Sequence, residues 1–270
     1  YLDEYLPWHY FYILFFSTTS LFLSLIIFFG LFVVTLRFFK RFINIDEEKL
    51  NNDIWKTEKE RNILFLLFSV FSPLFLIYFF DSIIYSGWRH LYFIFPSLII
   101  LGVYFIDYLK TVIRNKSLKK WLVIFLVLIV LNNIYNLFKL HPYQYIYFNT
   151  FFDERANNLF EIDYWGVANK QALVDIANIE PSKDKIVIGV ASFANLNLSK
   201  KMLNKKLKNK IIIAGQNYEN SDFIFNNNYS EVNPKVNDKY LIPPSYKKHS
   251  FLKKGEIMIY EIYKKDGTLK

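Results

Sequence analysis

The sequence has 270 residues, 53% of them hydrophobic and 20% aromatic, with a net charge of +9 and no cysteine. The missing cysteines exclude a disulfide framework and a thiolate metal site. The basic residues cluster beside apolar runs, which fits a membrane surface better than a nucleic-acid partner.

The composition changes sharply along the chain. Residues 1–140 are dominated by Phe, Leu and Ile, whereas residues 141–270 are rich in Lys, Asn and Tyr and have ordinary apolar patterning. This contrast predicts a membrane bundle followed by a soluble domain. The chain begins at Tyr1, with no charged leader before the first apolar run, so we expect it to be the C-terminal part of a longer protein.

Four apolar runs predict four membrane-spanning helices, at 11–36, 63–80, 91–106 and about 121–138. A hydrocarbon core about 30 Å thick needs roughly 20 apolar residues in a helix. An α-helical polytopic bundle is therefore the predicted architecture of residues 1–140.

The distribution of Lys and Arg predicts the orientation of these spans. The loops 37–62 and 107–120 are rich in both residues, whereas the loop 81–90 carries only Arg89. Because basic loops stay in the cytoplasm, the spans alternate without conflict. We predict a multi-pass protein of the inner (cytoplasmic) membrane, with the 81–90 loop and everything after residue 139 on the outer side.

After the last span, residues 141–165 are too aromatic for a free linker and too short to cross, so we predict a half-buried interfacial segment. Residues 166–270 alternate helical and strand patterns, which predicts a small α/β domain with a mostly parallel sheet. The expected helices are at 167–179 and 195–208, and the expected strands at 185–190, 211–214, 222–225 and 256–263.

Arg89 and His90 form the first candidate site, in a short polar turn between two apolar runs. A cation at the mouth of a hydrophobic bundle is costly unless something polar or anionic satisfies it, which indicates a functional site. The alternative is an interfacial pair whose long side chains reach the water and only anchor the loop.

The order of several motifs resembles a known family. Gly87-Trp88-Arg89-His90 is followed after one more span by His141-Pro142-Tyr143, and then by Glu161-Ile162-Asp163-Tyr164-Trp165-Gly166. This order resembles the C-terminal half of bacterial membrane glycosyltransferases of the GT-C type, which are related to dolichyl-phosphate-mannose protein mannosyltransferases and aminoarabinose transferases. The resemblance extends over nearly the whole chain.

The resemblance implies an enzyme that moves a sugar from a polyprenyl-phosphate carrier to an acceptor (protein, lipid or glycan) on the outer face of the membrane. It implies no cofactor. In that family the catalytic base is an acidic residue of the first outer loop, and nothing here matches that loop. The base is therefore expected upstream of Tyr1; otherwise this copy is inactive.

The family's chemistry gives the candidate residues their roles. Arg89 would hold the leaving phosphate, because a guanidinium binds phosphate oxygens in bidentate fashion, and His90 would add a hydrogen bond or donate a proton. Contacts to the sugar or acceptor are expected from Glu161, Asp163, Tyr164 and Trp165. The alternatives are solvated carboxylates, and for Asp163 a cap on the helix near Val167.

Two other functions compete with the enzyme. One is a non-catalytic polytopic membrane protein with an outer sensing or scaffold domain in envelope polysaccharide assembly. A transporter is disfavoured, since the spans carry no charge at mid-depth. His9 and His249 have no partner at metal-ligand spacing, so no metal site is predicted.

Overall fold

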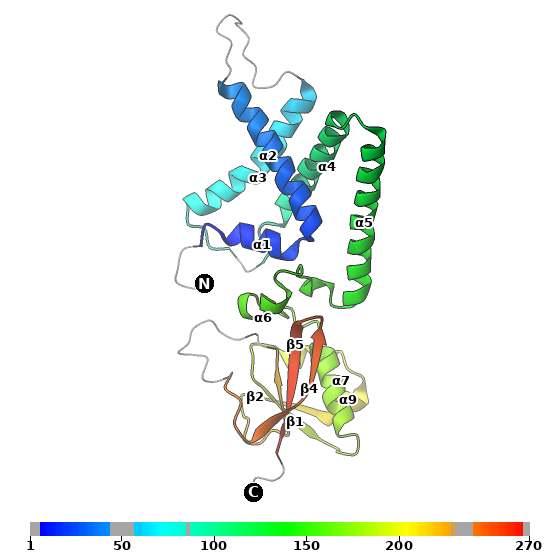
Figure 1. Cartoon of the computed structure of the whole chain (residues 1–270). Helices are drawn as coiled ribbons and strands as arrows, with labels where there is room; N and C mark the ends of the chain where they lie inside the picture. Colours follow the sequence, from blue (N-terminus) through cyan, green and yellow to red (C-terminus); the bar gives the residue numbers. More distant parts are fainter. Residues whose placement is uncertain (1–5, 44–56, 85–86, 228, 230–239, 267–270) are drawn as a thin grey trace, which may run out of the picture. The chain divides into compact units, whose positions relative to one another are not determined.

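The computed structural model divides into two compact units, Tyr1–Phe138 and Lys139–Lys270 (Figure 1). Each unit has its own set of elements and its own core, as the composition predicts. The structure describes residues 6–43, 57–84, 87–227, 229 and 240–266.

The first unit is helical. Four of its helices are long and apolar enough to cross a membrane, the third of them together with the short 3-10 turn that precedes it. The elements are α1 (Tyr10–Thr18), α2 (Leu21–Ile43), α3 (Glu58–Phe79), the 3-10 turn Tyr92–Ile94, α4 (Phe95–Val112) and α5 (Lys116–Leu140).

The predicted first span at 11–36 is wrong in its bounds. The run is divided into α1 and α2, which run in different directions (Figure 1). The break comes at Thr19, whose backbone is extended. Just before it, the hydroxyls of Ser17 and Thr18 both donate to the carbonyl oxygen of Leu14. Such side-chain bonds compete with the backbone ladder and favour a helix end.

Helices α2 and α4 pack closely where two glycines meet. A methyl group at Gly30 would lie 2.3 Å from the carbonyl oxygen of Leu101, and one at Gly102 would lie 3.1 Å from the side chain of Ile27. In a membrane, where apolar surface gains nothing by leaving lipid, such close backbone approach is what holds helices together.

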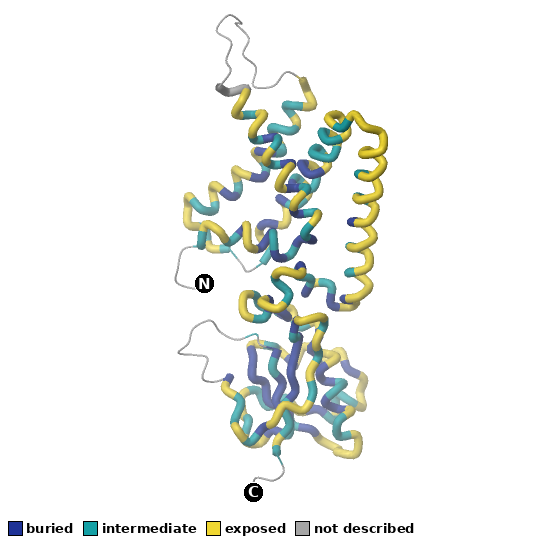
Figure 2. The backbone as a smooth tube through the Cα atoms, viewed as in Figure 1, coloured by how far each residue is buried: buried dark blue, intermediate teal, exposed yellow. Residues whose placement is uncertain are grey.

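Most of the spanning residues are not buried within the unit (Figure 2). In α5 only 6% of the span is buried, against 17–22% in the other three spans. Exposed Phe, Leu and Val side chains are costly in water, and a lipid environment removes that cost. The burial pattern therefore fits the membrane prediction.

The second unit is built on a five-stranded sheet with the order β2-β1-β3-β5-β4. The pairs β1–β2 and β1–β3 are parallel, whereas β3–β5 and β4–β5 are antiparallel. The predicted mostly parallel sheet is therefore wrong: the sheet is mixed. The strands are β1 (Ile186–Val190), β2 (Ile211–Gly215), β3 (Phe223–Asn226), β4 (Tyr246–Lys254) and β5 (Ile257–Lys265).

The sheet has an apolar core on each face. Phe223 and Phe225 of β3 enter the larger core, while Ile224 between them enters the smaller one, as the two-residue repeat of a strand requires. Helix α7 (Asn169–Ile179), which begins two residues later than predicted, contributes Leu173 and Ile176 to the larger core.

The predicted helix at 195–208 is two helices, α8 (Leu196–Lys201) and α9 (Lys205–Lys210). Asn204 divides them, because its side-chain oxygen accepts the amide of Leu207 at 2.9 Å and so caps α9. The sequence prediction also missed β4, an edge strand rich in lysine.

Residues 141–165 belong to the second unit by their contacts. They form the 3-10 turns Gln144–Ile146 and Asp153–Arg155 and helix α6 (Ala156–Leu159). Tyr143, Ile146, Ala156 and Ile162 are buried in the larger core. Asn157 joins α6 to β5, donating to the carbonyl of Met258 at 2.7 Å and accepting its amide at 2.9 Å. The placement of this segment at a membrane surface stays a prediction.

Candidate functional sites

The turn that carries Arg89 and His90 is fixed to the first helix of its unit. The indole N–H of Trp88 donates to the hydroxyl of Thr18 at 2.7 Å, and the amide of Gly87 donates to the hydroxyl of Tyr10 at 2.8 Å. Gly87 has a φ of +74°, a backbone conformation that glycine adopts most readily. The turn is thus held at two consecutive residues.

Aromatic packing holds the same turn from the side. The ring of Trp88 lies edge-on to Phe11 of α1 and to Phe95 of α4, with centroid distances of 6.1 and 5.3 Å. The following Leu91 is buried. Arg89 and His90, between these anchors, are both exposed. The fold therefore presents a cation and an imidazole at the end of the bundle where α4 begins.

Asp163 is buried, with 1% of its surface exposed, and its carboxylate caps the turn before α7. One oxygen accepts the hydroxyl of Tyr145 at 2.7 Å and the amide of Val167 at 2.9 Å; the other accepts the amide of Ala168 at 3.1 Å. The hydrogen bonds fix the turn that leads into α7, but the helix itself begins at Asn169, and its N-cap Ala168 makes no side-chain capping bond. A contact between Asp163 and a sugar stays a prediction.

The carboxylate of Asp163 and the phenol of Tyr145 shift each other's titration. Burial raises the pKa of Asp163, although the hydrogen bonds that its carboxylate accepts oppose that shift. Burial, and then the nearby charge of Asp163, raise the pKa of Tyr145 far above its ordinary value. Tyr145 therefore stays a neutral hydrogen-bond donor, and this pair is suited to fixing the turn rather than to exchanging protons.

Next to this cap, five rings form a continuous row that we name the aromatic edge: Tyr164, Trp165, Phe193, Tyr229 and Tyr240. Centroid distances are 5.3 Å for Tyr164–Trp165, 5.2 Å for Tyr164–Tyr229 and 5.5 Å for both Phe193–Tyr229 and Phe193–Tyr240. Trp165 is 70% exposed and Phe193 41% exposed. Rings in such a row offer flat apolar faces to a ligand.

The aromatic edge lies at the carboxyl ends of two neighbouring parallel strands. Phe193 follows β1 and Tyr229 follows β3, and the amide of Phe193 donates to the carbonyl of Tyr229 at 2.7 Å. From β1 the chain passes to β2 on one side, while β3 lies on the other. Ligands of α/β sheets bind at such a switch point, because the loops diverge there.

A buried asparagine connects the Asp163 turn with the end of β3. Asn227 donates to the backbone carbonyl of Asp163 at 3.4 Å and accepts the amide of Tyr229 at 3.2 Å. Tyr164 and Trp165, predicted from their motif, thereby meet rings from distant parts of the chain. Phe193, Tyr229 and Tyr240 were missed, since nothing in their local sequence indicates that they are neighbours.

Glu161 is half-buried, and one of its carboxylate oxygens is shielded from solvent. That oxygen has no hydrogen-bond partner among the residues that the structure describes. Shielded oxygens normally have a donor. Glu161 therefore differs from Asp163 two residues later, whose oxygens both accept protein donors.

The predicted site residues thus form two groups in different units. Arg89 and His90 belong to the first unit, and Glu161, Asp163, Tyr164 and Trp165 to the second. Comparisons with family models, with curated proteins and with solved structures find no match.

Proposed function

We propose that this chain is part of a membrane glycosyltransferase that moves a sugar from a polyprenyl-phosphate carrier to an acceptor on the outer face of the membrane. The observation that carries the proposal is the anchored turn at Gly87–His90. Trp88 and Gly87 are hydrogen-bonded to α1, which leaves the adjacent Arg89 exposed on a fixed backbone. The motif resemblance gives this turn its chemical assignment.

In this proposal Arg89 binds the phosphate of the lipid carrier. As the glycosidic bond breaks, negative charge grows on the phosphate oxygens, and a guanidinium already in place stabilises that charge without reorganising. His90 donates a hydrogen bond to the same phosphate. The sugar or acceptor contacts Tyr164 and Trp165 through its apolar ring face, and Glu161, which precedes them in the same motif, is a further candidate contact.

Substitution of Arg89 tests the proposal directly. In the full-length protein, reconstituted with a labelled polyprenyl-phosphate sugar, Arg89→Ala is expected to lower sugar transfer about 100-fold, the effect of losing one charged transition-state contact. Arg114→Ala, an exposed arginine after α4, is the matched control and should leave transfer unchanged. Unchanged transfer in Arg89→Ala would contradict the assignment.

A second function is supported by the aromatic edge, which can bind a glycan without any catalysis. In that case the chain belongs to a non-catalytic membrane protein with an outer sensing or scaffold domain. Measuring glycan binding and sugar transfer on the same protein distinguishes the two functions. Glycan binding that depends on Trp165 but is accompanied by no transfer from any lipid-linked donor would favour the second function.

A further inference from the structure

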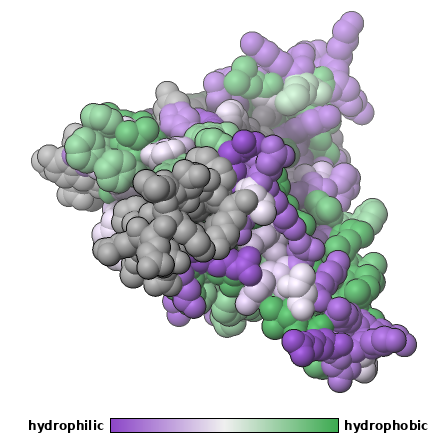
Figure 3. All heavy atoms as spheres, turned by 90° about the horizontal axis from the view of Figure 1, so that it is seen from above, coloured by the Kyte–Doolittle hydropathy of each residue, from purple (hydrophilic) through white to green (hydrophobic). Residues whose placement is uncertain are grey.

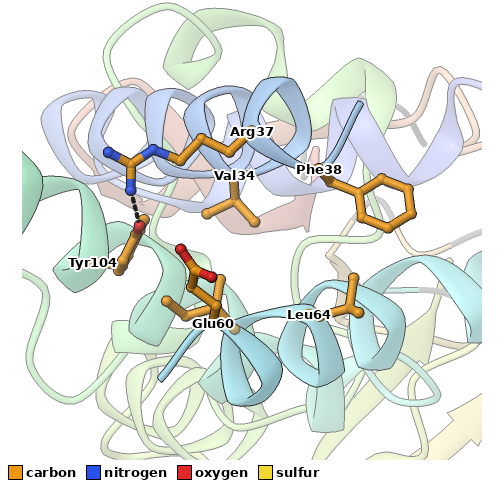
Figure 4. Close-up of a pocket in the computed structure, with 7 residues that line it drawn as sticks. Val34, Arg37, Phe38, Glu60, Leu64 and Tyr104 are labelled. Atoms are coloured by element: carbon orange, nitrogen blue, oxygen red, sulfur yellow. Dashed lines mark hydrogen bonds between the residues drawn. The ribbon is translucent and has the colours of Figure 1, made fainter. Parts of the chain in front are cut away.

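A pocket lies at the end of the bundle opposite to the Arg89 turn, between α2, α3 and α4 (Figure 4). It is lined by the C-terminal half of α2, the first two turns of α3 and one residue of α4. The lining residues are Val34, Arg37, Phe38, Glu60, Ile63, Leu64 and Tyr104. Apolar side chains therefore meet two opposite charges in one cavity.

The cation of this pocket is held in a defined position. Arg37 donates to the hydroxyl of Tyr104, and its guanidinium carbon lies 4.7 Å from the ring centroid of Tyr108. Figure 4 shows the guanidinium and the carboxylate of Glu60 both near the hydroxyl of Tyr104. A guanidinium has five N–H donors, so the bond to Tyr104 leaves it able to bind an anion as well.

A second ion pair borders the pocket. Lys59 donates to Asp107 at 2.7 Å, and its ammonium lies 5.9 Å from the ring of Tyr104. The surroundings of the pocket thus carry two cations, Arg37 and Lys59, and two carboxylates, Glu60 and Asp107. Seen from above, the molecule carries hydrophilic and hydrophobic residues side by side (Figure 3). The pocket lining therefore offers a cationic group, Arg37, and an anionic group, Glu60, to one ligand.

We propose that this pocket binds the headgroup of a phospholipid that carries a primary ammonium, of the phosphatidylethanolamine class. Its phosphodiester would accept from Arg37, and its ammonium would donate to Glu60. The apolar side chains of Val34, Phe38 and Leu64 would contact the glycerol and the upper acyl carbons. Basic pockets between spanning helices recognise anionic headgroups, and here the added carboxylate of Glu60 suits a headgroup that also carries an ammonium.

Other headgroups match the pocket less well. The phosphate of an anionic phosphatidylglycerol would gain Arg37 but would lie near the charge of Glu60. A phosphatidylcholine has no N–H to donate to that carboxylate, because its ammonium is quaternary. Free phosphoethanolamine has the right charges but lacks the chains that the apolar lining would contact.

Native mass spectrometry of the purified full chain, offered equal amounts of phosphatidylethanolamine, phosphatidylcholine and phosphatidylglycerol, tests the proposal. The unaltered chain is expected to retain phosphatidylethanolamine about tenfold over the other two, the ratio that one charged hydrogen bond gives. Millimolar phosphoethanolamine should not displace it. Equal retention of the three lipids, or displacement by the soluble headgroup, would overturn the proposal.

Two substitutions test the two charged contacts of the site separately. Glu60→Gln should abolish the preference for phosphatidylethanolamine and raise retention of phosphatidylglycerol. Glu58→Gln, at an exposed position two residues earlier in α3, should behave as the unaltered chain. Arg37→Gln should lower retention of phosphatidylethanolamine about tenfold, with Arg114→Gln as its control. If Arg37→Gln does not fold, the Glu60 and Glu58 pair decides alone: identical lipid profiles would refute the site.

Discussion

At the scale of single residues, the hydrogen bond between Trp88 and Thr18 is what fixes the turn of Arg89 to α1. Thr18→Val keeps the shape and removes the acceptor, and Trp88→Phe removes the donor. Each change is expected to destabilise the bundle by about 1 kcal/mol, and the double variant by less than the sum, since a bond can be lost only once. Unfolding in mixed detergent measures the coupling, and strict additivity would contradict it.

The buried carboxylate of Asp163 gives a second prediction, which depends on pH. Asp163→Asn places an amide N–H against the backbone amide of Val167 or Ala168, so we expect a loss of about 1–3 kcal/mol in the free energy of unfolding at neutral pH. Asp184→Asn, an exposed change of the same kind, is the control. Proteolysis in increasing urea measures both.

The sign of the pH effect follows from the raised pKa of Asp163. The folded chain holds this proton at pH values where the unfolded chain, with an aspartate pKa of about 3.9, has already lost it. The contribution of Asp163 to the free energy of unfolding therefore falls as the pH rises from the unfolded-state pKa through the raised pKa of the folded chain. The difference in free energy of unfolding between the unaltered chain and Asp163→Asn should widen as the pH is lowered. A difference that narrows would contradict the prediction.

Residue identity alone allowed some of the candidate site to be predicted. A motif of carboxylates and aromatics before a helix indicated both a helix cap and a ligand contact for residues near Asp163; the carboxylate in fact accepts the amides of Val167 and Ala168 in the turn before α7. The row formed with Phe193 and Tyr229 could not be predicted, because it depends on which strand ends are neighbours in the sheet. Strand order is a non-local property.

At the scale of elements, the crossing of α2 and α4 depends on Gly30. Its added methyl group would meet the backbone oxygen of Leu101, which cannot move without the helix, whereas at Gly102 it would meet the side chain of Ile27. Gly30→Ala should therefore destabilise the bundle by about 1–3 kcal/mol and Gly102→Ala by clearly less. Thermal unfolding in detergent ranks the two, and equal effects would contradict the close approach.

Long apolar runs were predicted well, because lipid requires about 20 apolar residues regardless of tertiary contacts. Ends and short elements were predicted less well. The break at Thr19 comes from hydroxyl groups inside an apolar run, and the break before α9 from the cap at Asn204. The strand β4 was missed because an edge strand has one exposed side and here carries several lysines, which edges tolerate.

At the scale of the whole molecule, a membrane unit and an α/β unit follow one another in one chain, and the proposed function requires the Arg89 turn and the α/β unit on the same side of the membrane. With four spans, the Arg89 turn and the α/β unit share one side of the membrane when the loop before α3 and the turn before α5 are on the opposite side. In that orientation the proposed phospholipid pocket faces the cytoplasmic leaflet, because Arg37 lies near the end of α2 and Lys59 in the first turn of α3.

This arrangement can be tested with single cysteines, since the chain contains none. Ile83→Cys and Lys201→Cys should react with a membrane-impermeant maleimide in intact spheroplasts, and Lys119→Cys only after permeabilisation; all three positions are exposed. The reason is the excess of Lys and Arg in the loop that carries Lys119, since loops rich in these residues are expected to stay in the cytoplasm. Labelling of position 119 alone would invert the orientation and remove Arg89 from the outer face. Labelling of position 83 without position 201 would mean that α4 and α5 do not both cross the membrane. The two groups of site residues would then act on opposite sides of the membrane.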